Sequence, residues 1–110
     1  MSEKQQMEEK TDADLVRAAL EDRDAFVHLV DRYQHRIYNY IRRITNTKPE
    51  EAEDILQEVF LKVFRNLNAF DPELKFSSWI YRIAHNQVVS NFRKRKARAE
   101  NYSVELSEEM

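Results

Sequence analysis

The stretch T-K-P-E-E-A-E-D-I-L-Q-E-V-F-L-K-V-F-R-N-L, residues 47–67, decides the fold that we expect for this chain. Apolar residues recur along it every three or four positions, which predicts an amphipathic helix. Thr47 and Glu50 have the spacing of a capping box around Pro49, so the helix should begin here. The stripe expected to face the core comprises Ala52, Ile55, Leu56, Val59, Phe60, Val63, Phe64 and Leu67.

Two helical patterns precede this stretch. Asp12 can cap a short helix that continues to about Leu20, and Asp22 can cap a longer one that ends near Asn46. Residues 1–11 are polar, and we expect a flexible, frayed N-terminus there. The longer helix should bury a stripe made of Phe26, Leu29, Val30, Tyr33, Ile37, Ile41 and Ile44.

A fourth helix is expected after a loop at residues 68–75, which contains Asp71-Pro72. Ser77 or Ser78 can cap this helix, which should continue to about residue 98 before a polar linker or tail at 99–110. Its expected core residues are Ile80, Ile83, Ala84, Gln87 and Val88. The chain has no glycine, the residue that hairpin corners and bulges use most, and only two prolines. We therefore expect an all-α fold, a compact bundle of about four helices over residues 12–98.

Charge is strongly segregated along the chain. Residues 75–98 contain seven Lys or Arg residues and no Asp or Glu, so the remainder carries −9 in a chain whose net charge is −2. A basic helix that bears aromatic residues on an acidic body is typical of a face offered to nucleic acid. Aromatic rings beside cations suit single-stranded bases in particular, because the bases stack while the phosphates meet the charges.

Polar residues on the fourth helix form a candidate contact stripe. Arg82, Asn86, Val89 and Arg93 share roughly one face, with Ser90 adjacent. Amide and hydroxyl groups can bond base edges or sugars, and arginines can pair with phosphates. Trp79 and Phe70 are candidates to hold an unstacked base, whereas Tyr81 and Phe92 are expected in the core. The run Arg93, Lys94, Arg95 and Lys96 would complement a helix C-terminus, but four consecutive cations exceed that need.

No catalytic or metal constellation emerges. His28 and His35 could share a helix face, but the chain lacks Cys and its carboxylates stand only at ordinary surface spacing, so no metal site is expected. His85 has no orienting carboxylate, and without glycine there is no glycine-rich phosphate loop. Asp12 and Asp14 are interpreted as capping charges. We expect a binding module without cofactor or small-molecule substrate, located in the cytoplasm and not in a membrane.

The helix at residues 47–67 also carries a polar face opposite its apolar stripe. Asp54, Gln57, Glu58 and Leu61 lie there at spacings of three and four. Such a face can dock another protein or can simply be solvated. Spacing alone favours the solvated face, since surfaces tolerate single leucines freely.

Three blocks taken together bear a resemblance to a known family. They are D-A-F-V-H-L-V-D-R-Y at 24–33, E-A-E-D-I-L-Q-E-V-F-L-K-V-F at 51–64 and K-F-S-S-W-I-Y-R-I-A-H-N at 75–86. In this order and at these intervals they resemble region 2 of bacterial sigma factors, closest to the extracytoplasmic-function group. The resemblance extends over residues 12–98.

The resemblance implies two partners. Asp54, Gln57 and Glu58 match positions that contact the clamp helices of the RNA polymerase β′ subunit, which favours docking over solvation for this face, including Leu61. The loop and fourth helix match the part that holds the non-template strand of the promoter −10 element melted. The positions expected on that DNA surface are Phe70, Lys75, Ser77, Trp79, Arg82, Asn86 and Ser90, and the charge pattern adds Arg93, Lys94, Arg95 and Lys96.

The chain departs from the family pattern at three places. Arg82-Ile83 stands where primary sigma factors have two adjacent tryptophans, which implies dependence on a closely matched promoter. Glu21-Asp22 stands where the extracytoplasmic-function relatives commonly have glycine, which implies a wider corner. The C-terminal helix-turn-helix domain that reads the −35 element is expected to be absent, because the sequence ends near the start of the usual linker.

Two other functions remain open. The basic helix can dock an acidic regulatory partner, such as an anti-sigma factor, and that partner could also cover the polymerase-binding face. A membrane-surface helix is less favoured, because Asn86, Ser90 and Asn91 interrupt the apolar face that it would need.

Overall fold

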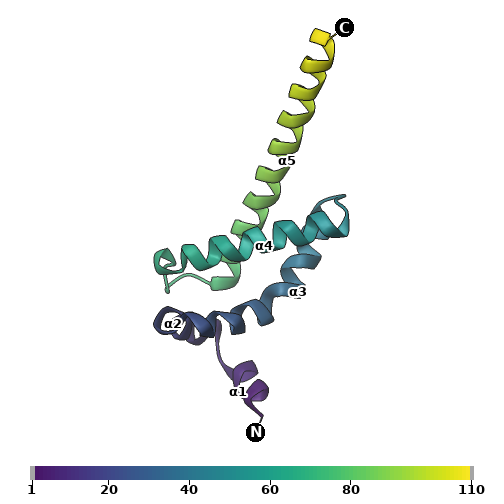
Figure 1. Ribbon diagram of the computed structural model, residues 1–110. Helices are drawn as coiled ribbons and strands as arrows, with labels where there is room; N and C mark the ends of the chain where they lie inside the picture. The colour runs from purple at the N-terminus through teal and green to yellow at the C-terminus, as the bar shows by residue number, and fades with distance from the viewer. Residues whose placement is uncertain (1, 110) are drawn as a thin grey trace.

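The computed structural model describes residues 2–109, and all the regular elements in that range are helical (Figure 1). The main helices are α1 Glu3–Glu9, α2 Asp12–Glu21, α3 Phe26–Ile44, α4 Pro49–Arg65 and α5 Phe76–Glu109. Two single turns of 3₁₀-helix, η1 Arg23–Ala25 and η2 Leu67–Ala69, connect them. The expected all-α fold is confirmed.

The core lies where α4 packs against both α3 and α5, with α2 closing one end. Its members repeat at helical spacing on each element, as the sequence predicted. The buried apolar residues are Leu15, Val16, Ala19, Leu29, Tyr33, Ile37, Ile41, Ala52, Ile55, Val59, Val63, Leu67, Phe70, Phe76, Ile80 and Ala84. Gln87 is also buried, so the expected inward face of α5 is confirmed, with Ile83 and Val88 half-buried against the same core.

The capping box predicted at Thr47 and Glu50 is wrong. The N-cap of α4 is Lys48, which makes no side-chain cap hydrogen bond, and Pro49 is the first helical residue. The Thr47 hydroxyl instead lies 2.9 Å from that of Thr45, whose Oγ1 donates to the Ile41 carbonyl. Thr47 is therefore engaged with the end of α3. The start of α4 is therefore stabilised by Pro49, which has no N–H that needs a partner, and by the acidic residues of the first turn.

The helix α2 is capped by Thr11, one residue before the expected Asp12. The Thr11 hydroxyl accepts from the Asp14 backbone N–H at 3.1 Å, and Asp14 accepts from the Thr11 N–H at 3.3 Å. These hydrogen bonds, together with one from Arg17, lower the pKa of Asp14. The carboxylate therefore stabilises the fold above its ordinary pKa, and this contribution is lost as the pH falls through the lowered value.

Thr11→Ala should lower the free energy of unfolding by about 1 kcal/mol, because it removes this cap. For a domain of this size, the midpoint of thermal unfolding followed by circular dichroism should fall by about 4–8 °C. Ser78→Ala is the control, since Ser78 is an exposed position inside α5. Equal melting temperatures for Thr11→Ala and the wild-type chain would contradict this assignment of the cap.

The ends of the chain differ from expectation. Residues 3–9 form α1, whose first turn carries a capping box between Ser2 and Gln5, and Arg32 of α3 donates to the Met7 carbonyl at 2.7 Å. Helix α5 begins at Phe76, before both serines expected to cap it, and continues to Glu109 rather than Arg98. Figure 1 shows α5 projecting well beyond the other helices, and the longest dimension of the molecule is 68 Å.

Two further expectations for α5 are wrong. The cations at residues 93–96 lie within the helix and not at its C-terminus, so they do not complement a helix end. Phe92 is 68% exposed rather than part of the core, because no neighbouring helix covers its side of α5. Tyr81, in contrast, is half-buried and packs edge-on against Tyr40 with ring centroids 5.1 Å apart.

Candidate functional site

The polar face of α4 is exposed in the structure. Asp54, Gln57 and Glu58 all face solvent, and Leu61 is 43% exposed beside them. The buried positions Ile55 and Val59 on the opposite side hold α4 against the core and so fix the direction of this face. The structure therefore brings the four predicted protein-binding residues together on one rigid element.

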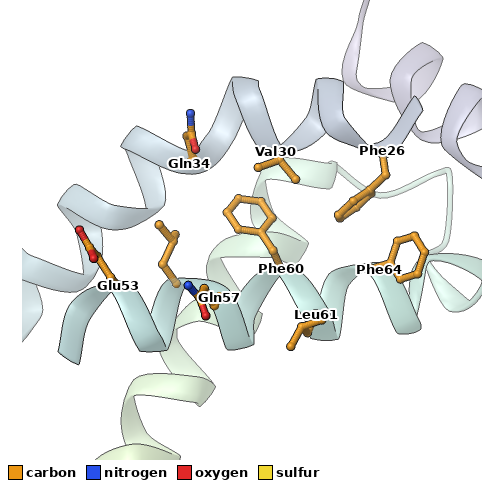
Figure 2. A pocket seen from close by; sticks show the side chains of 9 residues that line it. Phe26, Val30, Gln34, Glu53, Gln57, Phe60, Leu61 and Phe64 are labelled. Carbon is orange, nitrogen blue, oxygen red and sulfur yellow. The ribbon is translucent and has the colours of Figure 1, made fainter. Parts of the chain in front are cut away.

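A groove of about 640 Å³ adjoins this face between α3 and α4. Figure 2 shows Phe26 and Val30 of α3 facing Phe60 and Phe64 of α4, while Leu61 points away from α3. The rings of Phe26 and Phe64 meet edge to face at 5.1 Å. The complete lining is Phe26, Val30, Gln34, Glu53, Leu56, Gln57, Phe60, Leu61 and Phe64.

The sequence analysis placed part of this groove in the core. Leu56, Phe60 and Phe64 were expected to be buried, but the first two are half-buried and Phe64 is exposed. The sequence did contain a sign of this groove, because the apolar stripe of α4 is two rows of residues wide. Ala52, Ile55, Val59 and Val63 already form one buried row, and Leu56, Phe60 and Phe64 form a second row that the neighbouring helices only partly cover.

Four of the predicted nucleic-acid residues on α5, Arg82, Asn86, Ser90 and Arg93, recur at spacings of three and four and so share one accessible stripe of the helix. Arg82 and Asn86 are exposed, Ser90 is partly exposed, and the cations from Arg93 to Lys96 are exposed. Arg95 differs from the others because its Nη1 lies 3.1 Å from the Glu51 Oε1 of α4. The stripe thus carries polar groups from Arg82 to Ser90, and exposed cations follow farther along the helix.

An aromatic cluster supports the loop before α5. Phe70 packs against Trp79 with centroids 5.0 Å apart and against Phe76 at 5.6 Å, and Phe76 and Trp79 are 5.8 Å apart. Phe70 is only 8% exposed, so it is not the open stacking surface that the sequence suggested, whereas Trp79 remains half-buried. The cluster fixes how the loop meets α5.

A second pocket, of about 290 Å³, lies between this loop and the start of α2. Phe70, Lys75 and Ser77, three of the predicted contact residues, line it together with Phe76. The α2 side is formed by Thr11, Asp12 and Ala13. The sequence analysis did not place those residues at a binding site, because nothing local indicates that the start of α2 packs beside a loop about sixty residues away.

The histidines do not gather into a site. Within residues 2–109, no group of three His, Cys, Asp or Glu side chains could hold a metal ion. His85 Nδ1 lies 3.3 Å from the Tyr40 hydroxyl and has no carboxylate partner among the described hydrogen bonds. None of the described helices is both long and apolar enough to cross a membrane.

Comparisons with known proteins agree with this arrangement. The family model for sigma-70 region 2 matches residues 29–98. The ECF RNA polymerase sigma factor SigW of Bacillus subtilis is 44% identical over 75 residues, which are 68% of this chain and 40% of that protein. The ECF RNA polymerase sigma-E factor of Escherichia coli K12 is 39% identical over 80 residues, 72% of this chain and 41% of that protein. The chain thus spans about two fifths of the length of these relatives.

A solved structure is similar over nearly its whole length. It is the NMR structure of the complex formed by an engineered region 2 of sigmaE in complex with GTAAAA. The TM-score is 0.73 at 37% sequence identity, and the match covers 89% of this chain and 97% of that one. Sequence and fold agree, and the chain belongs to the sigma-70 region 2 family, within the extracytoplasmic-function group of sigma factors.

Proposed function

We propose that this domain is a non-enzymatic transcription initiation module that binds core RNA polymerase and holds the promoter −10 element open. The observation that carries the proposal is the likeness to an engineered region 2 of sigmaE in complex with GTAAAA. The exposed stripe of α5 supports it independently, since polar and cationic groups there are accessible together. Because both proposed partners, core RNA polymerase and promoter DNA, are cytoplasmic, the module acts in the cytoplasm.

The nucleic-acid surface consists of two parts with different tasks. On α5, Arg82 and Arg93 meet phosphates, while Asn86 and Ser90 bond base edges or sugars of the non-template strand. At the loop, Lys75 and Ser77 border the 290 Å³ pocket, in which an unstacked base can sit. Phe70 forms part of the pocket wall, and Trp79 packs behind it.

Strand separation follows from what the pocket accepts. A base can enter only after it has left the duplex stack, so its binding energy favours the melted strand. Arg82-Ile83 takes the place of a tryptophan wedge, and Arg82 is exposed at that point. Opening therefore depends on capture of matching bases rather than on insertion of a large ring.

The polymerase surface is the exposed face of α4. Asp54, Gln57 and Glu58 present two carboxylates and an amide, which suit basic and hydrogen-bonding residues of the β′ clamp helices. Leu61 adds apolar area that is 43% exposed in the isolated domain. This surface and the α5 stripe lie on different helices, so one chain can hold both partners at once.

Asn86→Ala should weaken binding of the single-stranded DNA GTAAAA about tenfold, because it removes a group that reads base edges. Its effect on a scrambled oligonucleotide should be much smaller. Fluorescence anisotropy with labelled oligonucleotides measures both affinities, and Asn39→Ala on the exposed surface of α3 is the matched control. Equal losses on both sequences would mean that Asn86 contacts only the backbone.

A second function is favoured by the exposed Phe92. This ring lies 68% exposed among the cations of α5, and an acidic regulatory protein with an apolar patch, such as an anti-sigma factor, would cover both. Such a protein should compete with GTAAAA for the domain. Simultaneous binding of the oligonucleotide and the regulator would exclude this surface as the docking site.

A further inference from the structure

The pocket beside the loop has a wall that the proposed function does not use. This wall is formed by Thr11, Asp12 and Ala13 at the start of α2. It faces the segment from Phe70 to Ser77, and the pocket between them has a volume of about 290 Å³. That volume lies at the lower end of small-molecule sites, which suits one ring system rather than a larger ligand. Asp12 is the acidic group in this wall.

The Asp12 carboxylate is held in one orientation from the side of α3. Its Oδ1 accepts from Arg32 Nη1 at 3.0 Å, and its Oδ2 accepts from the Tyr33 hydroxyl. Arg32 is itself anchored, since its Nη2 donates to the Met7 carbonyl at 2.7 Å. Burial raises the pKa of Tyr33, and the Asp12 carboxylate raises it further, so the hydroxyl keeps its proton and acts as the donor.

The carboxylate keeps the capacity to bind a ligand. Two donors occupy it, whereas an ionised carboxylate offers about four acceptor positions. The Asp12 side chain is 29% exposed, so a molecule in the pocket can approach it. A free carboxylate would repel the phosphates of a nucleic acid, but the Arg32 ion pair offsets its charge. An oriented acceptor remains, and it selects for hydrogen-bond donors.

We propose that Asp12 is a specificity-determining residue, which accepts a hydrogen bond from the exocyclic amino group of an unstacked base in this pocket. Adenine, cytosine and guanine carry such an amino group, and thymine lacks one. The proposal rests on the proposed function of the domain and deepens it, because it assigns part of the sequence preference to α2. Thymine is disfavoured at the position that enters the pocket.

Tyr33 is a positioning residue for the same pocket. Its hydroxyl holds Asp12, and its ring packs edge-on against Phe76 with centroids 5.4 Å apart. Phe76 lines the pocket from the α5 side. Tyr33 thus ties the two walls together, so the carboxylate and the aromatic cluster keep a fixed separation.

The test uses the single-stranded DNA GTAAAA with one adenine at a time replaced by 2′-deoxynebularine, which lacks only the amino group. Binding of each oligonucleotide to the full chain is measured by fluorescence anisotropy. For the wild-type chain, one of the four positions should lose about tenfold in affinity, as expected for a lost hydrogen bond to a charged group. For Asp12→Asn the loss at that position should shrink to about threefold or less, since a neutral acceptor contributes less.

Asp14→Asn is the matched control, because it removes the same charge from the same helical turn and Asp14 does not line the pocket. It should keep the wild-type pattern across the four positions. Tyr33→Phe, which keeps the ring and removes the hydroxyl, should reduce discrimination at the same position only. That outcome separates orientation of Asp12 from general loss of the fold.

Identical patterns for the wild type and Asp12→Asn would overturn the role of Asp12 while leaving the proposed function intact. A uniform loss at all four positions in Asp12→Asn would overturn it as well, because it would show only damage to the domain. Failure of the wild-type chain to bind unmodified GTAAAA would instead contradict the proposed function itself.

Discussion

Replacing Arg93 and Lys94 together by glutamine should weaken binding of single-stranded GTAAAA by roughly tenfold or more near 50 mM salt. Both residues are exposed on α5, so little of the fold depends on them. Each phosphate that a cation neutralises contributes about −0.7 to the slope of log affinity against log salt for single strands. The slope should therefore fall in magnitude by about 1.4.

Arg95 is left in place in this experiment because it pairs with Glu51. The matched control replaces Lys48 and Arg65, exposed cations at the two ends of α4, by glutamine. It removes the same net charge but should leave the slope unchanged. Titrations at four or more salt concentrations measure both slopes. Equal changes in the two double variants would show that only the overall charge matters, and that the α5 cations contact no phosphates.

Replacing Asp54 and Gln57 together by alanine should weaken binding to the β′ clamp helices by about 10- to 100-fold. Both side chains are exposed on α4, and their removal leaves the buried row on its other face untouched. The free energy of unfolding should therefore stay within about 0.5 kcal/mol of the wild-type value. Calorimetric titration with a purified clamp-helix fragment measures the affinity.

The control for this pair is the double variant Asp31→Ala and Asn39→Ala, which removes one carboxylate and one amide from the exposed surface of α3. It should bind the clamp helices as the wild type does. Wild-type affinity in the Asp54 and Gln57 variant would contradict the assignment of α4 as the polymerase surface.

Periodicity predicted the helices because burial on one side of a helix leaves a repeat in the sequence. The buried positions of α3 and α4 follow that repeat, from Leu29 to Ile41 and from Ala52 to Val63. Periodicity does not report how much of a stripe the neighbours cover. For that reason Phe60 and Phe64, at the same spacing, line a groove instead.

The end of α5 could not be predicted by the same means. An expected stop near Arg98 rested on the loss of apolar residues, but a helix can continue in water without packing partners when its residues favour helix. Phe92 is exposed although it stands at an apolar position, because the local sequence does not show which sides of α5 the neighbouring helices cover.

The candidate site divides in the same way. Residues that share one helix, such as Asp54 with Glu58 or Arg82 with Asn86, could be grouped from spacing alone. The pocket could not, because it joins Asp12 to Lys75 and Ser77 through tertiary packing. Phe70 was expected as an open platform, but packing against Phe76 and Trp79 turns it into a wall.

The central claim is that this domain prefers unpaired bases of matching sequence to any other form of DNA. Its most direct test is a titration of the full chain with three labelled probes near 100 mM salt: single-stranded GTAAAA, a scrambled strand of the same composition, and a duplex that contains GTAAAA. We expect saturable binding to single-stranded GTAAAA that is at least about tenfold tighter than to either other probe. Equal affinity for the three probes, or tighter binding to the duplex, would contradict the account.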